Sequence, residues 1–317
     1  MKFVVAGGSG HLGTLLVRAR HAAGDEVVVL SRAPRAAPWR VEVWDAKTLG
    51  PWATELDGAD VVVNMAGRSV NCRYTPENRR AIMDSRVESA RIVGEAIARA
   101  AKPPRLWVQM STATIYAHRF DAANDEATGI IGGDEPGVPE TWRFSIEVAK
   151  AWEREVDESR VPATRTVKLR AAVVMSSLAG GPFDILLRLV RLGLGGWAGS
   201  GKQYVSWVHG ADFVRAIDHI VRDDSLRDAV NVAAPDPLPN AEFMRELRAA
   251  WGMPVGLPAP SALLPLGAFA MRTETELILK SRRVVSGKLA ASGFAFDFRA
   301  WDAAARDLCG RVRRGER

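Results

Sequence analysis

The chain has 317 residues, which is too short for three domains of ordinary size. Hydrophobic residues make up 47% of it, enough for a sizeable core. Its net charge is +6, yet the arginines are interleaved with Asp and Glu, and only the terminal GRVRRGER is locally basic. This pattern argues against nucleic-acid binding and suits a protein whose partner is a small phosphorylated or acidic molecule.

The first half of the chain alternates continuous apolar runs with helical stretches. Such runs predict strands that are buried on both faces of a sheet. We expect them at residues 2–7, 26–31, 41–44, 60–67, 105–112 and 166–175. We expect helices at 14–24, closed by Gly24, and at 76–102 and 142–159. The alternation indicates the α/β class, with a doubly wound parallel sheet of the Rossmann type.

Glycine and proline accumulate after Met175, and the strand–helix rhythm weakens. A strand at 228–235 is expected to return to the sheet, and the rest of the chain has a mostly helical pattern. We therefore expect two units: a Rossmann domain in 1–175, to which 205–234 returns, and a smaller, mostly helical substrate-side subdomain in 176–204 and 235–317.

A glycine-rich loop, GGSGHLG, joins the first expected strand to the first helix. Gly7 permits a tight turn, Gly10 lets the backbone approach a pyrophosphate, and Gly13 allows the helix to pack closely on the strand. Amide groups at the start of that helix then face the anion. The loop predicts a dinucleotide site made by Gly7, Gly8, Ser9, Gly10, His11, Leu12 and Gly13. Because the spacing is GxxGxxG, a glycine-rich turn without a ligand is the alternative.

The second expected strand ends in LSRAPR, where an NAD-specific protein usually carries Asp or Glu to bind the ribose 2′-hydroxyl. This chain has Ser31 and Arg32 there, with Arg35 close behind. A guanidinium suits the additional 2′-phosphate of NADP(H). The predicted cofactor is therefore NADP(H), with an ordinary exposed loop arginine as the alternative interpretation of Arg32.

Three motifs in this register, GxxGxxG, VVVNMAG and STATIY, resemble the extended short-chain dehydrogenase/reductases. Longer segments are similar to an atypical "epimerase family" branch with its own C-terminal domain; they include NMAGRSVNCRYTPENRRAIMDSRV, GLGGWAGSGKQYVSWVHGADFVRAI and ELILKSRRVVSGKLAASGFAF. Together these segments run from Met1 to about Trp301. The resemblance implies a Rossmann fold, a nicotinamide cofactor and hydride transfer or a related reaction on a small molecule.

Extended members of the family pair a tyrosine with a lysine four residues later, on one helix face, so that the ammonium lowers the tyrosine pKa. No YxxxK occurs in this chain. If Glu153 is the glutamate that often follows the motif, Ser145 and Ala149 take the two positions, and Lys150 is turned about 100° away. The usual proton-transfer pair is absent.

Other residues are candidates for the chemistry. The resemblance implies that Thr112, with Ser111 beside it, polarises a substrate oxygen at the end of a strand, where open α/β sheets bind ligands. Hydroxyls that only satisfy backbone groups are the alternative. Tyr116 or Tyr74 would supply the proton. Arg86 falls on the apolar stripe of its helix, where a charge needs either an internal salt bridge or an anionic ligand.

Several further contacts are implied by the resemblance. Gln203, Trp207 and His209 are expected on the substrate side of the cleft, but a structural hydrogen bond is the favoured role of the His209 side chain, and Trp207 is as consistent with the core. Asp212 is expected to cap the helix that follows it. The remaining implied cofactor contacts are Asp45, Ala66, Gly67 and Val173.

The sequence favours an NADPH-dependent oxidoreductase that reduces a small carbonyl or conjugated alkene without the usual YxxxK pair. Two alternatives stay open: a non-catalytic NADP(H)-binding sensor or interaction protein, and an epimerase- or dehydratase-like enzyme that uses bound cofactor. Because the chain shows no secretory segment, no apolar run of about 18 residues and only two distant cysteines, we expect a cytoplasmic protein without a membrane partner. Its oligomeric state stays open between monomer and homodimer.

Overall fold

A seven-stranded parallel sheet forms the centre of the computed structural model, which describes residues 1–260 and 276–316. The strand order is β10-β6-β5-β4-β1-β2-β3. These strands are β1 Lys2–Ala6, β2 Glu26–Ser31, β3 Arg40–Val43, β4 Val61–Asn64, β5 Leu106–Thr112, β6 Arg165–Ala171 and β10 Asp228–Val232. The order reverses between β1 and β4, which places the switch point of a doubly wound sheet at the carboxyl end of β1. The predicted Rossmann-type α/β class is confirmed.

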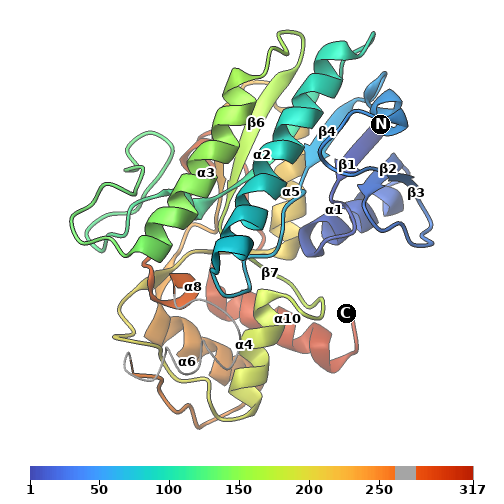
Figure 1. Ribbon diagram of the computed structural model, residues 1–317. Helices are drawn as coiled ribbons and strands as arrows, with labels where there is room; N and C mark the ends of the chain where they lie inside the picture. Colours follow the sequence, from blue (N-terminus) through green and yellow to red (C-terminus); the bar gives the residue numbers. More distant parts are fainter. Residues whose placement is uncertain (261–275, 317) are drawn as a thin grey trace.

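Helices cover both faces of the sheet, because successive side chains of its strands are buried on opposite sides (Figure 1). α1 and α5 pack against the face that carries Phe3 and Val5. α2, α3 and the 3-10 helix η1 cover the face that carries Val4 and Ala6. The bounds are α1 His11–Ala22, η1 Pro51–Leu56, α2 Pro76–Arg99, α3 Glu140–Glu158 and α5 Gly210–Arg222.

The helix ends follow local chemistry. α1 starts three residues before its predicted start, directly after Gly10, and stops before Gly24, whose φ of +82° is the left-handed conformation expected there. The Thr75 side chain caps α2 by accepting from the amide of Asn78, and Pro76 occupies the first position. Both devices fix where α2 begins, at the mouth of the site described below.

The strand predicted at 166–175 is two strands, because the backbone changes partner at Ala172. The Ala172 amide still donates to Val232 of β10, but the Val173 amide donates to Ser206. β7 (Val173–Met175) therefore pairs with β9 (Trp207–His209) in a separate two-stranded sheet. The return of 205–234 to the main sheet is made by α5 and β10.

A second group of helices lies beyond the carboxyl ends of the strands (Figure 1). Their core stacks Phe243 on Trp301 at 4.0 Å between ring centres, with Phe183 and Leu308 around them. Part of the region predicted to be helical after residue 236 lies outside the described residues. The described elements are α4 Pro182–Arg191, β8 Tyr204–Val205, β11 Leu238–Pro239, α6 Asn240–Trp251, α8 Glu276–Leu279, α9 Gly287–Ala291 and α10 Trp301–Arg313.

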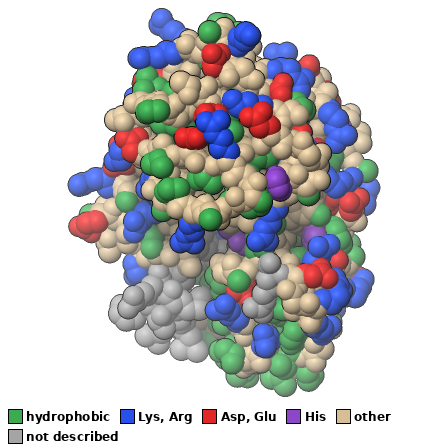
Figure 2. Space-filling view, turned by 90° about the vertical axis from the view of Figure 1, so that its right-hand side faces the viewer, with side chains coloured by type: hydrophobic (Ala, Val, Ile, Leu, Met, Phe, Trp, Pro, Cys, Tyr) green, Lys and Arg blue, Asp and Glu red, His purple; other side chains and the backbone are tan. Residues whose placement is uncertain are grey.

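Acidic and basic side chains are interspersed over the face shown in Figure 2, as their distribution along the sequence predicts. Within residues 1–260 and 276–316, no helix combines the length and the hydropathy that a bilayer span requires.

Candidate functional site

A cleft of about 450 Å³ opens at the switch point of the sheet, a volume in the range of small-molecule sites. It is bounded by the glycine loop, by the ends of β2 and β4, and by the first turns of α2. Eight of the predicted cofactor residues line it: Gly7, Ser9, Gly10, Ser31, Arg32, Asp45, Ala66 and Gly67.

The glycine loop is shaped by close backbone approaches. Gly7 has φ +74°, and a Cβ there would lie 2.8 Å from the backbone nitrogen of Ala66. A Cβ on Gly13 would lie 2.5 Å from the Gly7 carbonyl oxygen, so the helix can approach the loop only without a side chain. α1 has no side-chain cap and no acidic residue in its first turn. Its N-terminus therefore suits an anion such as a pyrophosphate.

Two charged residues flank the far end of the cleft. Arg32 is exposed, and within the described part of the chain it forms no ion pair. Asp45 accepts from the amides of Lys47 and Thr48 at 2.8 and 2.9 Å, and these bonds with the Thr48 hydroxyl lower its pKa to about 2. Asp45 is thus a permanent anion that shapes its own turn, whereas the Arg32 guanidinium is available to a ligand.

Six predicted cofactor residues do not line the cleft: Gly8, His11, Leu12, Gly13, Arg35 and Val173. Gly8 and Gly13 support the loop from within, where neighbouring atoms leave no room for a side chain. The His11 ring nitrogen Nε2 lies 3.0 Å from the Ser176 hydroxyl, and burial lowers the pKa of His11. His11 therefore anchors the loop to the segment after β7, and its side chain does not face the cleft.

A second, smaller cavity of about 120 Å³ lies at the carboxyl end of β5, between α2, α3 and α8. At about 30 Å³ per water, it has room for about four waters or a small organic group. Three predicted catalytic residues, Tyr74, Arg86 and Thr112, contribute to its wall. Its other polar residues are Thr114, Ser145 and Glu276, and its apolar wall is Val70, Ile82, Phe144, Val148 and Trp152.

Arg86 occupies this wall without an acidic partner. Its Nη1 donates to the carbonyl oxygens of Arg68 and Ile82 at 3.0 and 3.1 Å, and its guanidinium lies 5.1 Å from the Trp152 ring centre. No carboxylate among the described residues lies within ion-pair distance, so the internal salt bridge is not the explanation of Arg86. Burial lowers its pKa to about 10, which leaves it cationic at neutral pH. Arg86 is therefore a cation that an anionic ligand would stabilise.

Ser111 and Tyr116 lie outside both cavities, which corrects their predicted placement. The Ser111 hydroxyl donates to Glu153 at 2.6 Å, and Glu153 accepts two bonds from Arg170. Tyr116 donates to Asn231 at 2.9 Å and accepts from Arg170. Both hydroxyls belong to one buried network that ties α3 to β5, β6 and β10.

Ser145 and Ala149, the residues expected at the two YxxxK positions, both lie on α3. Ser145 Oγ lies in the wall of the second cavity, and Ala149 is fully buried. Lys150 is turned away, with its Nζ 3.8 Å from a carboxylate oxygen of Asp134. Ala149, the residue expected at the position of the usual lysine, therefore contributes no charge.

Gln203, Trp207 and His209 do not line either cavity, so their expected place on the substrate side is not met. Gln203 donates to the carbonyl of Ala198, and Trp207 is fully buried in the second core. His209 itself caps α5 by accepting from the Ala211 amide, and its other ring nitrogen contacts an acid on α10. The prediction that Asp212 is the cap is therefore wrong. The buried carboxylate of Asp212 accepts from the amides of residues 297 and 298 and fixes the loop that they belong to.

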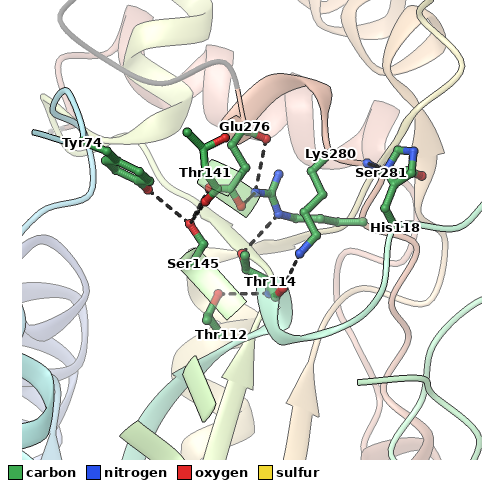
Figure 3. Close-up of polar contacts among 10 residues, drawn as sticks. Tyr74, Thr112, Thr114, His118, Thr141, Ser145, Glu276, Lys280 and Ser281 are labelled. Atoms are coloured by element: carbon green, nitrogen blue, oxygen red, sulfur yellow. Dashed lines mark hydrogen bonds and ion pairs between the residues drawn. The ribbon is translucent and has the colours of Figure 1, made fainter. Parts of the chain in front are cut away.

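The sequence did not single out the charged side chains of 276–282, of which Glu276 lines the second cavity and Lys280 contacts Thr114 in its wall (Figure 3). Glu276 Oε2 accepts from the Ser145 hydroxyl at 2.5 Å. Lys280 Nζ donates to the Thr114 carbonyl at 2.6 Å, and Arg282 Nε donates to the Thr114 hydroxyl at 3.2 Å. Burial, with the nearby Arg282, lowers the pKa of Lys280 to about 7. The available signal was three charged residues among the seven of ELILKSR, one before and two after the apolar run LIL.

Comparison with known proteins agrees with this architecture. Residues 3–133 match the model of the NAD dependent epimerase/dehydratase family, and residues 259–308 match a domain of unknown function, DUF1731. The epimerase family protein SDR39U1 of Homo sapiens is 31% identical over 97% of this chain and 99% of its own length. The epimerase family protein YfhF of Bacillus subtilis is 28% identical over 94% of each chain.

Among solved structures, human SDR39U1 crystallised with NADPH superposes with a TM-score of 0.84 at 29% identity, over 98% of this chain and 99% of that one. The match in sequence extends over both the Rossmann part and the C-terminal DUF1731 segment. The chain therefore belongs to the NAD dependent epimerase/dehydratase family of extended short-chain dehydrogenase/reductases, in the group of epimerase family proteins that end in a DUF1731 domain.

Proposed function

We propose that this protein binds NADP(H) in the larger cleft and reduces a small carbonyl or conjugated-alkene substrate in the second cavity. The cofactor part is supported by the glycine loop, by the exposed Arg32 at the cleft, and by the NADPH in the crystal structure of the human relative. The α1 amides and Gly10 would hold the pyrophosphate, and Arg32 would bind the 2′-phosphate. When bound, the cofactor supplies the hydride.

The residues of the second cavity would then divide the remaining work. Thr112 Oγ accepts from the Thr114 amide, so its own proton is free to bind and polarise a substrate oxygen. Tyr74 would donate a proton to that oxygen. Burial, together with the charge of Glu276, raises the Tyr74 pKa to about 12, so it holds its proton throughout the physiological range. Arg86 would bind an anionic group of the substrate and so orient it.

One observation carries this proposal: Thr112, Tyr74 and Arg86, which come from three different segments, meet in one small cavity at the carboxyl end of the sheet. Ligands of open α/β sheets bind at that edge. The apolar side chains in the wall lower the local dielectric constant, which strengthens each polar contact that the substrate makes.

The test is NADPH oxidation with a panel of short carbonyl and enoyl compounds, with and without a carboxylate group. We expect turnover for anionic members, lost in Thr112→Val and weakened mainly in KM in Arg86→Gln. Ser111→Ala is the matched control, because that hydroxyl faces the buried network. Tight NADPH binding without turnover of any member would instead favour a non-catalytic sensor, and product without net NADPH oxidation would favour epimerase-like chemistry.

A further inference from the structure

The DUF1731 segment contributes a carboxylate, that of Glu276, to the wall of the second cavity. Glu276 is 1% exposed, and it lies in the cavity wall beside Ser145, the residue expected at the position of the family's tyrosine. It is held there from two sides: Arg282 Nη2 lies 3.4 Å from its Oε1, and Lys280 fastens the end of α8 to Thr114. A buried carboxylate is costly unless it is paired and hydrogen-bonded, and Arg282 and Ser145 meet this need for Glu276.

Glu276 ends a chain of three oxygen atoms. Tyr74 Oη lies 3.4 Å from Ser145 Oγ, and Ser145 Oγ lies 2.5 Å from Glu276 Oε2. Figure 3 shows the three side chains pointing toward one another across the cavity. A hydroxyl both accepts and donates, so Ser145 can pass a proton in either direction. The missing lysine explains why such a chain is needed, since no ammonium from α3 lowers the Tyr74 pKa.

We propose that Glu276, through Ser145, is the proton-relay group that recharges Tyr74 during the reduction proposed above, on which this inference rests. As the substrate oxygen takes the Tyr74 proton, the Tyr74 O–H bond breaks and a substrate O–H bond forms. The Glu276 carboxylate first takes one proton from solvent. Tyr74 Oη then takes the proton of Ser145, and Ser145 Oγ takes the carboxyl proton of Glu276. The carboxylate is thereby restored, and one solvent proton enters per turnover. The reverse reaction uses the same path from Tyr74 to the Glu276 carboxylate.

The relay lies among other charges that set its pH range. Arg282 and Lys280 approach from the DUF1731 segment, and Arg86 approaches from α2. The remaining titratable side chains near this cluster are Cys72 and Arg73 beside Tyr74, and His118 and Glu135 beside Lys280. Each of them is unchanged in the variants used below.

The first experiment measures the pH dependence of NADPH oxidation in wild type, Glu276→Gln and Ser145→Ala. Wild-type reduction is expected to fall as pH rises, because each turnover takes one proton from solvent through this chain. In both variants the rate should no longer fall as pH rises, and turnover should be about 10²-fold slower. Their NADPH affinity should be unchanged. Glu276→Asp should restore part of the rate. Glu140→Gln, an exposed α3 acid paired with Arg79, is the matched control and should keep the wild-type profile.

The second experiment needs no turnover. The absorbance of tyrosinate is measured as the pH is raised into the alkaline range, in the protein without cofactor. Subtracting the same titration of the Tyr74→Phe variant isolates the contribution of Tyr74. Glu276→Gln should lower the Tyr74 pKa, since the carboxylate opposes tyrosinate formation. An unchanged Tyr74 titration, or a wild-type pH profile in Glu276→Gln, would overturn the relay while leaving the oxidoreductase proposal intact. Absence of turnover by the wild type with every panel compound would overturn both.

Discussion

Lys280 gives the sharpest test of how the DUF1731 segment is held. It is 1% exposed, its Nζ donates to the Thr114 carbonyl, and burial with Arg282 nearby lowers its pKa to about 7 from 10.5. Below pH 7 both the folded and the unfolded chain carry the proton, and the folded state bears the full cost of the buried charge. Between pH 7 and about 10.5 the unfolded chain binds more protons, so folding stability rises with pH.

The size of this effect follows from the two pKa values. Each pH unit inside that window stabilises the fold by up to about 1.4 kcal/mol. Near pH 7 folded Lys280 is still partly protonated, so the slope is smaller there and the total between pH 7 and pH 9 is about 2 kcal/mol. Lys280→Met removes the titrating group. The free energy of unfolding of wild type minus that of Lys280→Met should therefore rise by about 2 kcal/mol over this range.

The assay is urea unfolding of both proteins at pH 7, 8 and 9, followed by tryptophan fluorescence. Lys288→Met is the matched control, because Lys288 also donates to a carbonyl, that of Arg227 at 2.7 Å, but is only partly buried. Its difference from wild type should stay flat with pH. Wild-type and Lys280→Met stabilities that run parallel from pH 7 to 9 would refute the reasoning, because they would mean that Lys280 keeps an ordinary pKa.

Three further substitutions test other parts of the structure. Gly13→Ala should abolish NADPH binding in calorimetry, because the new Cβ would lie 2.5 Å from the Gly7 carbonyl oxygen; unchanged affinity would contradict the loop geometry. Glu153→Gln should lower the free energy of unfolding by about 3–5 kcal/mol, since it leaves Arg170 buried without its partner; a loss below 1 kcal/mol in urea unfolding would count against the network. Arg32→Ala should weaken NADPH about tenfold or more and leave NADH unchanged; an equal effect on both cofactors in calorimetry would exclude a 2′-phosphate contact.

The sheet and its nucleotide edge were predictable because their signals are local. Continuous valine runs such as Val61–Val63 identify buried strands, and the loop from Gly7 to Gly13 carries its geometry in consecutive residues. The break at Ala172 was not predictable, because it depends on which strands, 34 or 60 residues away, offer the next carbonyl. Pairing partners at such distances leave no periodic trace in one sequence.

The second cavity was predicted only in part, for the same reason. Tyr74, Arg86 and Thr112 were found from a loop, a helical stripe and a strand end. Tyr116 was misplaced because its hydrogen-bond partner, Asn231, lies 115 residues further along the chain. Glu276 was missed because its contact with Ser145 bridges 131 residues and depends on how the DUF1731 segment folds back. Side chains that complete a site from a distant segment require the tertiary structure.

A crystal structure of the protein with NADP⁺ would show where each part of the cofactor binds. We expect the pyrophosphate at the α1 N-terminus, the 2′-phosphate against Arg32, and the nicotinamide ring turned toward the cavity of Thr112, Tyr74 and Glu276. A nicotinamide directed away from that cavity, or a 2′-phosphate remote from Arg32, would contradict this expectation.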